Sequence, residues 1–190
     1  MIPGFNQSGV LPPFLPQSSP TQSADMAPYK ATMLELVERY GGTPERKAIL
    51  TGLLDFRAAI RAAGFSNGFQ WINGSFIEDC EATRHRSPND IDIVTFSRRL
   101  SGYAPAEWRR FVIANPQLFN PALVKQTFKC DAYFEDLTVP PEAIVSKTRY
   151  WFGLFSHQRD TFLWKGLLVV PLTDNDLAAR QLLGDDSHAS

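Results

Sequence analysis

Residues 90–96 read Asp-Ile-Asp-Ile-Val-Thr-Phe, and this stretch decides the fold class that we predict. Its acidic and apolar residues alternate at the start, as expected of a β-strand with one face in the core. Side chains two apart on a strand point to the same face. The carboxylates of Asp90 and Asp92 are therefore predicted to lie together, roughly 6–7 Å apart along the strand. Ile91 and Ile93 would anchor the opposite face in the core.

Two carboxylates on one strand face repel each other unless a cation lies between them. We expect Mg²⁺, or Mn²⁺, because such an ion takes carboxylate and phosphate oxygens as ligands. A strand predicted at residues 126–134 adds Asp131, a carboxylate flanked by apolar positions whose burial without a partner is costly. If this strand lies beside residues 90–96, the three acids can hold two metal ions. Lys129 shares the predicted face of Asp131 and could neutralise it in place of a metal.

A further strand, predicted at residues 69–73, runs directly into Gly74 and Ser75. Glycine lets the backbone approach a phosphate closely, and the serine hydroxyl with nearby N–H groups can donate to phosphate oxygens. An ordinary turn is the alternative. Arg84 and Arg86 follow in a polar loop predicted at 78–89, where they either contact phosphate or are solvated. The candidate nucleotide-binding residues are Gly74, Ser75, Arg84, Arg86 and Lys129.

The rest of the chain predicts helices around these strands. Apolar spacing and capping residues predict helices at residues 29–40, 43–64, 106–113, 122–125 and 173–184. A last strand is predicted at 162–170, and residues 148–155 are aromatic and ambiguous. Thr43 and Thr173 are the expected N-caps, with Asp176 placed as in a capping box. The class is therefore α+β or α/β-like, a small mixed β-sheet flanked by helices.

Residues 1–28 are rich in Pro, Ser, Gln and Gly, a composition that cannot hold a regular helix or a central strand. Apolar residues such as Phe5, Leu11 and Phe14 would be costly to leave in water. We therefore expect an extended N-terminal arm that lies on the domain or on a partner subunit, with a disordered tail as the alternative. Residues 29–184 would form one domain and residues 185–190 a flexible tail.

Composition excludes several classes of protein. The 190 residues carry 19 basic and 20 acidic side chains, a formal net charge of -1 that gives no whole-chain drive toward nucleic acid. Apolar runs fall short of the roughly 20 residues that a membrane span needs, and the N-terminus does not read as a signal peptide. We expect a cytoplasmic protein without a membrane partner. Cys80 and Cys130 are too few for a disulfide framework or a structural zinc site.

The motifs Trp71–Phe76 (WINGSF) and Pro88–Asp92 (P-x-DID), followed by Asp131, resemble the signature of the polymerase β-like nucleotidyltransferase superfamily. That signature is a hydrophobic strand, Gly-Ser or Gly-Gly, a spacer, an Asp-x-Asp or Asp-x-Glu pair, and a third carboxylate on a later strand. More closely, the chain resembles a bacterial family of uncharacterised nucleotidyltransferase-like proteins over residues 5–172. These proteins also share an N-terminal sGvLPP segment, which is Ser8–Pro13 in this chain.

The resemblance implies a nucleotidyltransferase fold and a metal-dependent enzyme. Such an enzyme moves a nucleoside monophosphate from a nucleoside triphosphate, with ATP as the expected donor, to a hydroxyl of a protein, an RNA end or a small molecule. Asp90, Asp92 and Asp131 would be the catalytic and metal-binding residues. Small stand-alone members of the superfamily often modify a protein or a tRNA, and some act as antitoxins or defence components. A toxin or acceptor protein is therefore an expected partner, whereas the neutral net charge disfavours RNA.

Two other functions fit the same residues. The first is a non-catalytic module of this fold that binds a nucleotide or a partner protein, as an antitoxin would. Three mutually repelling acids argue against it, because a retired site has no electrostatic reason to keep them. The second is a scaffold that assembles homo-oligomers through the arm and the aromatic residues near Tyr150–Phe155.

Overall fold

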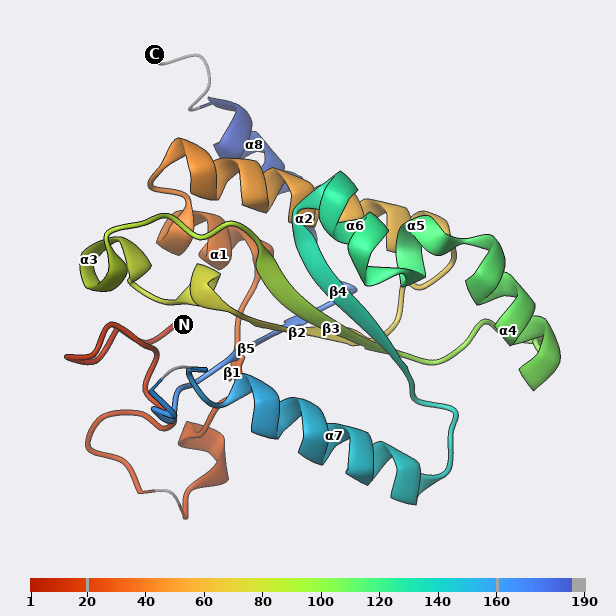
Figure 1. Ribbon diagram of the computed structural model, residues 1–190, viewed down its shortest axis with the longest axis horizontal. Coiled ribbons are helices and arrows are strands. Elements are labelled where there is room, and N and C mark those ends of the chain that lie inside the picture. The colour runs from red at the N-terminus through yellow and green to blue at the C-terminus, as the bar shows by residue number, and fades with distance from the viewer. Residues whose placement is uncertain (20, 160, 186–190) are drawn as a thin grey trace.

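The computed structural model describes residues 1–19, 21–159 and 161–185. Its class is mixed α+β, with a five-stranded mixed sheet and, within those residues, eight α-helices (Figure 1). The strands are β1 (Tyr29–Lys30), β2 (Phe69–Asn73), β3 (Ile91–Ser97), β4 (Cys130–Asp136) and β5 (Leu168–Pro171). The helices are α1 (Met33–Tyr40), α2 (Pro44–Ala62), α3 (Cys80–Arg84), α4 (Pro105–Ala114), α5 (Pro116–Phe119), α6 (Pro121–Phe128), α7 (Pro141–Phe155) and α8 (Leu177–Asp185). Two 3-10 turns are η1 (Ser23–Asp25) and η2 (Ser75–Ile77).

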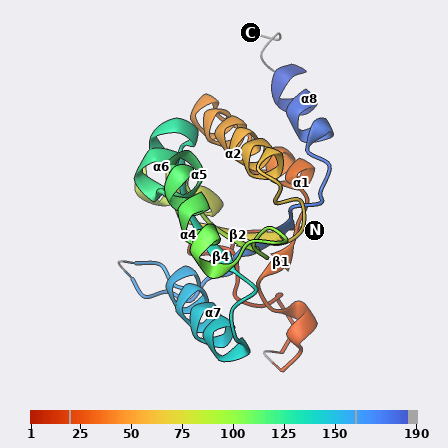
Figure 2. The same cartoon turned by 90° about the vertical axis from the view of Figure 1, so that its right-hand side faces the viewer.

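The sheet lies between two layers of helix. Helices α1, α2, α6 and α8 cover one face and α7 lies on the other (Figure 2). The strand order is β1-β5-β2-β3-β4, in which β2 runs antiparallel to both of its neighbours and β3 runs parallel to β4. Because of these directions, the end of β2 and the starts of β3 and β4 meet at one end of the sheet.

The two faces of β2 have different partners because side chains alternate along a strand. Trp71 faces α7, where its ring lies 6.3 Å from the ring of Phe152, centroid to centroid. Gln70 faces the other layer, where its side-chain oxygen accepts a hydrogen bond from Arg57 of α2 at 2.8 Å. By the same alternation Asn73 lies on the α7 face, at the last position of the strand.

A buried charge network joins α2 to the C-terminal part of the fold. The Arg57 side chain is fully buried and donates from Nε and Nη2 to the two carboxylate oxygens of Asp176, at 2.9 and 3.1 Å. Its Nη2 also donates to the carbonyl of Pro171 at 2.8 Å, and Arg61 donates to Asp176 at 2.5 Å. A buried charge is stable in such a place only when it is fully paired.

The segment before β1 packs against the rest of the chain. Val10 and Leu11 are buried, and the Gly166 amide donates to the Leu11 carbonyl at 2.8 Å. The Tyr29 hydroxyl donates to the Pro12 carbonyl at 2.9 Å. The apolar side chains of the expected arm are thus covered by this same chain.

Several predicted elements are confirmed. The strand predicted at 69–73 is β2, and the predicted helices at 106–113 and 122–125 are the central parts of α4 and α6. Thr43 caps α2, because its hydroxyl accepts from the Arg46 amide at 3.3 Å. Residues 148–155, which the sequence left ambiguous, belong to α7.

Other boundaries are corrected. The helix predicted at 29–40 is shorter, because residues 29 and 30 pair with β5 and a capping box at Thr32 starts α1. The strand predicted at 126–134 begins at Cys130, since the preceding residues finish α6. Lys129 then adopts a φ of 56°, a left-handed conformation that ends the helix. The polar loop predicted at 78–89 contains α3, which Asp79 caps.

The C-terminal elements also differ. β5 covers only the last part of the strand predicted at 162–170 and ends at Pro171. The last helix begins at Leu177 and not near Thr173, because the Asp176 carboxylate is bonded to the buried Arg57 and the half-buried Arg61. Residues 186–190 of the predicted tail lie outside the described residues. None of the helices in the described ranges has the length and apolar character that crossing a membrane requires.

Candidate functional site

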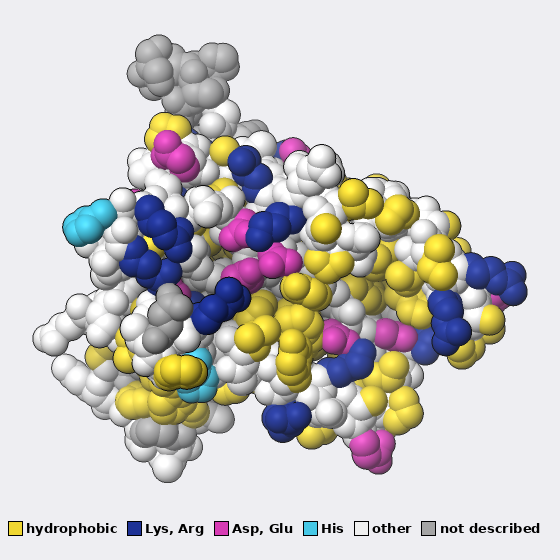
Figure 3. Space-filling view, viewed as in Figure 1, with side chains coloured by type: hydrophobic (Ala, Val, Ile, Leu, Met, Phe, Trp, Pro, Cys, Tyr) yellow, Lys and Arg dark blue, Asp and Glu magenta, His cyan; other side chains and the backbone are white. Residues whose placement is uncertain are grey.

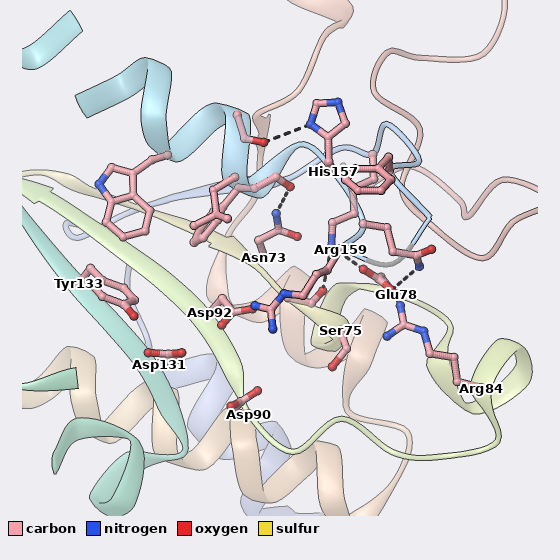
Figure 4. Close-up of a pocket in the computed structure, with 18 of the residues that line it drawn as sticks. Asn73, Ser75, Glu78, Arg84, Asp90, Asp92, Asp131, Tyr133, His157 and Arg159 are labelled. Atoms are coloured by element: carbon pink, nitrogen blue, oxygen red, sulfur yellow. Dashed lines mark hydrogen bonds and ion pairs between the residues drawn. The ribbon is translucent and has the colours of Figure 1, made fainter. Parts of the chain in front are cut away.

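A cavity of about 910 Å³ opens at the end of the sheet where β2 ends and β3 and β4 begin (Figure 4). The turn after β2 forms one wall, and the end of α7 with the loop that follows it forms the opposite wall. Acidic, basic and aromatic side chains line it. The acids are Glu78, Asp90, Asp92 and Asp131, the bases are Arg84, Arg86, Lys125, Arg159 and Lys165, and the aromatic rings are Tyr133, Trp151, Phe155 and Phe162.

The structure brings the three predicted carboxylates into this one cavity. Asp92 and Asp131 are Cα partners in the parallel ladder between β3 and β4, so they lie side by side. Asp90 precedes β3 by one residue and lines the same cavity. Burial, together with the negative charges of Asp90 and Asp131, raises the pKa of Asp92 to about 6. The acids therefore repel one another, as the sequence predicts.

A lysine of α6 neutralises part of this negative charge. The Lys125 ammonium pairs with Asp90, and its Nζ lies 3.9 Å from Oδ2 of Asp131. The hydrogen bond to Asp90 raises the pKa of Lys125. Lys129, predicted to share the face of Asp131, is exposed at the end of α6 and is not part of the cavity lining. The reason is that α6 continues further than predicted, so Lys129 ends a helix and does not lie in a strand.

The donor set fits a hard divalent cation in its chemistry. Carboxylate oxygens are the ligands that Mg²⁺ prefers, and a cation would relieve the repulsion that raises the pKa of Asp92. Across the described ranges, no three His, Cys, Asp or Glu side chains are grouped as ligands of one ion. Binding of an ion would therefore require the carboxylates to draw together and the Lys125 ammonium to leave Asp90.

The Gly74-Ser75 turn lies against Asp92. Gly74 has a φ of 84°, a conformation that glycine adopts without strain, and a Cβ placed there would overlap the Asp92 carboxylate. Glycine at this position thus lets the backbone approach the carboxylate closely. Ser75 lines the cavity and opens the short turn η2. This turn has only three residues, so it does not supply a helix dipole beside Ser75.

Asn73 contributes a polar atom that the sequence reading did not identify. Its side chain is 2 % exposed and its Nδ2 donates to the carbonyl of Phe155. The Oδ1 atom is buried and has no hydrogen-bond partner among the described residues. Buried acceptors without partners are rare in folded proteins, so an unpaired acceptor in a cavity wall indicates a ligand or water that would donate to it.

A buried ion cluster connects the two walls. Glu78 is 3 % exposed, pairs with Arg84 and Lys165, and accepts from Nε2 of Gln158 at 2.9 Å. Lys165 also donates to the carbonyl of Gly74 at 3.3 Å. Burial lowers the pKa of Lys165 to about 7; Asp92 opposes this shift and Arg84 adds to it. The cluster therefore fixes the loop after α7 to the turn after β2.

Arg46 of α2 anchors the turn after β2 through hydrogen bonds to its backbone. Its guanidinium donates to the carbonyls of Phe76 and Glu78 at 2.6 and 2.8 Å, and it pairs with both carboxylate oxygens of Glu81 at 2.7 and 2.8 Å. The hydrogen bond from Arg46 lowers the pKa of Glu81 to about 2. The position of Ser75 thus depends on a contact with the helical layer.

Sequence reasoning found the three aspartates and the turn but missed Glu78 and much of the second wall. Of the predicted residues, Gly74, Ser75, Arg84, Arg86 and the three aspartates all line the cavity. Lys165 had a signal, since it is a single cation within the apolar stretch 162–170. Lys125 and Arg159 had none, because only the packing of α6 and of the loop after α7 brings them to the site.

Comparison with known proteins places the chain in a family. The model of a family of unknown function, DUF6932, matches residues 3–171, and the chain belongs to that family. No curated protein and no solved structure matches the chain.

Proposed function

We propose that this protein is a metal-dependent nucleotidyltransferase with a polymerase β-like nucleotidyltransferase fold. It would move a nucleoside monophosphate from a nucleoside triphosphate to a hydroxyl acceptor. One observation carries the proposal: Asp92 and Asp131 are ladder partners, and Gly74 brings a strand-to-turn backbone against Asp92. Two carboxylates beside a Gly-Ser turn support the proposal, because they would put a cation site next to a phosphate site.

The charges of the cavity suit a triphosphate with a divalent cation. Four acidic side chains and five basic ones line the same space, so anionic and cationic parts of one ligand can both be matched. The exposed Arg86 and its neighbour Arg84 lie on the wall that carries Ser75. A volume of about 910 Å³ is sufficient for a nucleotide, since sites for small ligands commonly measure roughly 300–1,000 Å³.

The proposed chemistry is an in-line transfer. The acceptor hydroxyl oxygen forms a bond to the α-phosphorus, and the bond from that phosphorus to the oxygen bridging to the β-phosphate breaks. Pyrophosphate leaves with the electron pair of that bond, and the hydroxyl proton passes to the Asp131 carboxylate. Mg²⁺ held by Asp90, Asp92 and Asp131 would supply charge neutralisation on the phosphate oxygens. Ser75 and the arginines would orient the triphosphate, and such positioning accounts for much of phosphoryl-transfer catalysis.

The donor we propose is ATP, and the acceptor is a hydroxyl on a protein, an RNA end or a small molecule. A cognate toxin or another defence component would be one such protein partner. This choice rests on analogy with the superfamily that the sequence resembles.

A second candidate is a nucleotide- or partner-binding module without turnover. The internal ion pairs favour it, because Lys125 pairs with Asp90 while Glu78 pairs with both Lys165 and Arg84. A site whose charges satisfy one another is stable without any ligand. The two candidates therefore differ in whether a bound triphosphate is cleaved.

Pyrophosphate release tests the proposal. The full chain would be incubated with each nucleoside triphosphate and Mg²⁺ or Mn²⁺, with candidate proteins and RNA as acceptors. Release should fall to background in Asp92→Asn and in Asp131→Asn, and persist in the control Asp55→Asn. Asp55 is an exposed carboxylate on α2 that pairs with Arg180, far from the cavity lining. Nucleotide binding in a calorimeter without release would select the binding module, and neither binding nor release would refute both.

A further inference from the structure

A second cavity, of about 420 Å³, adjoins the carboxylate cavity along β4. Tyr133 and Trp151 line both cavities, so the two lie next to each other. The other residues of the second cavity are Trp108, Val112, Phe119 and Pro121 from the α4–α6 side, Phe134, Glu135 and Asp136 from β4, and Lys147 from α7. We call this cavity the edge groove.

The edge groove passes across an open edge of the sheet. β4 is the last strand in the sheet order, and β3 is its one strand partner within the described ranges. Phe134 faces the α2 layer, where its ring lies 5.1 Å from that of Phe65. Glu135 faces α7 and accepts from Nε1 of Trp151 at 2.7 Å. A cavity lined by side chains from both faces of a strand must run along the edge between them.

The backbone of β4 has hydrogen-bonding groups directed to this edge. The Lys129 carbonyl accepts from the Ile91 amide at 3.1 Å, so odd-numbered residues of β4 direct their backbone groups to β3. Alternate residues of a strand bond to opposite neighbours, and Ala132 and Phe134 therefore direct an N–H and a C=O to the open side. Such an edge is a template for a further strand.

Apolar side chains on both sides of the edge groove are incompletely covered. No residue of α4 is fully buried, although the helix carries Trp108, Phe111 and Val112. On the opposite side of the groove, Tyr133 is 38 % exposed. Figure 3 shows apolar side chains gathered on this face beside acidic and basic ones. The alternating side chains of an added strand would cover the apolar side chains on both sides of the groove.

We propose that the acceptor is an extended polypeptide segment that adds to the open edge of β4 and brings a Ser, Thr or Tyr hydroxyl to Asp131. This inference rests on the proposed nucleotidyl transfer. Asp131 lies near the start of β4 and Asp136 at its end, a span of about 17 Å at the usual rise per residue. A short strand along this span therefore ends beside the carboxylates.

The charges of the groove favour a polypeptide over RNA. Glu135 and Asp136 line it, and its one lining cation among the described residues, Lys147, is already paired with Glu135. Asp136 is likewise paired with Arg99, so the groove offers a phosphate backbone no unpaired cation among its described lining residues. A peptide main chain instead supplies neutral N–H and C=O groups that match those of Ala132 and Phe134.

The test uses an array of short peptides, each with one Ser, Thr or Tyr and apolar residues at alternate positions. The fluorescently labelled full chain is applied to the array, and transfer is followed separately with α-³²P-labelled ATP and Mg²⁺. Wild-type protein should bind a subset of peptides and label their hydroxyls. Methylation of the peptide nitrogens at alternate residues should weaken binding about tenfold in one register and little in the other, because each removes an N–H donor.

Variants of the edge groove distinguish strand addition to β4 from other modes of peptide binding. Ala132→Pro removes an N–H on the open side, where proline is tolerated in an edge strand, and should abolish peptide binding. Val112→Glu places a charge on the side of the groove formed by α4 and tests the groove even if Ala132→Pro fails to fold. Ile113→Glu is the matched control, since Ile113 is 71 % exposed and outside the groove lining. Both groove variants should lose about tenfold or more in affinity, and the control should not.

Several results would overturn the inference. No bound peptide, or binding that is insensitive to N-methylation in either register, would show that the edge does not take a strand. A change from dimer to monomer in Ala132→Pro, measured by sedimentation, would assign the edge to a second copy of the chain. Pyrophosphate release on small hydroxyl acceptors with no peptide binding would retain the enzyme and refute the acceptor. Peptide binding without ATP binding would refute the enzyme and, with it, the acceptor role.

Discussion

The Nζ atom of Lys125 lies 3.9 Å from Oδ2 of Asp131, while the same ammonium pairs with Asp90. Lys125 belongs to α6 and Asp131 to β4, two elements joined by the left-handed residue Lys129. A cation covalently fixed to the protein thus occupies the charge environment that a divalent ion would need. Lys125 would therefore compete with a divalent ion for these carboxylates.

Removal of this competitor should increase the affinity for metal. Lys125→Met is expected to bind Mn²⁺ about three- to tenfold more tightly than wild type, because a half-exposed ion pair no longer has to break. Lys129→Met is the control, since Lys129 is a neighbouring exposed lysine outside the cavity. Electron paramagnetic resonance of free Mn²⁺ would measure the Mn²⁺ affinity of both variants. Weaker binding in Lys125→Met alone would mean that Lys125 assists the ligand and does not compete with it.

Asp92 should make the fold less stable as the pH rises. Its folded pKa is about 6 against a reference of 3.8, so the folded state holds the proton more tightly than the unfolded state does. Its contribution is therefore fully present below about pH 4 and is lost as the pH rises through 6, a change of about 3 kcal/mol. Urea unfolding in EDTA at a series of pH values would measure it.

The variant Asp92→Asn supplies the comparison for that series. It should lack the loss of stability between pH 4 and 6, because the amide does not ionise. Parallel curves for the two proteins would show that Asp92 is not the group responsible. Addition of Mg²⁺ to wild type at pH 7 should raise the unfolding midpoint, since a ligand that binds the folded state stabilises it.

The buried Arg57–Asp176 pair should be essential for stability and irrelevant to the cavity. Arg57→Met leaves a 5 % exposed carboxylate with Arg61 alone and is expected to lower the free energy of unfolding by about 3–5 kcal/mol. Arg180→Met breaks an exposed pair with Asp55 and should change the free energy of unfolding by less than about 1 kcal/mol. Urea denaturation compares the two. Equal small effects would show that the buried network is replaceable.

Gly74→Ala should damage the site while the fold persists. A Cβ at Gly74 overlaps the Asp92 carboxylate, and a φ of 84° with a ψ of -171° adds about 1–3 kcal/mol of strain for a residue other than glycine. We expect nucleotide affinity in a calorimeter to fall at least about tenfold. Gly153→Ala is the matched control at the same cavity, because no atom lies within 4 Å of a Cβ added there. Equal nucleotide affinities in the two variants would show that the Gly74-Ser75 turn does not contribute to nucleotide binding.

Local patterns in the sequence were sufficient for part of this description. The strand at residues 69–73 and the helix capped by Thr43 follow from short-range preferences, and the α+β class follows from their order. The alternation around Asp92 also placed the carboxylates on one face. The end of α6 was misjudged, because Gln126–Phe128 suit either a helix or a strand and packing against β4 decides between them.

The sequence by itself determined which residues are candidates for the site, namely Gly74-Ser75, the Asp-x-Asp pair and a third acid, since strand periodicity fixes the face of each side chain. Only the tertiary structure decided which charges meet them. The β3–β4 register set Asp92 opposite Asp131, the packing of α6 brought Lys125 to Asp90, and the loop after α7 buried Lys165 against Glu78. Such contacts join residues far apart in the chain, and local spacing carries no information about them.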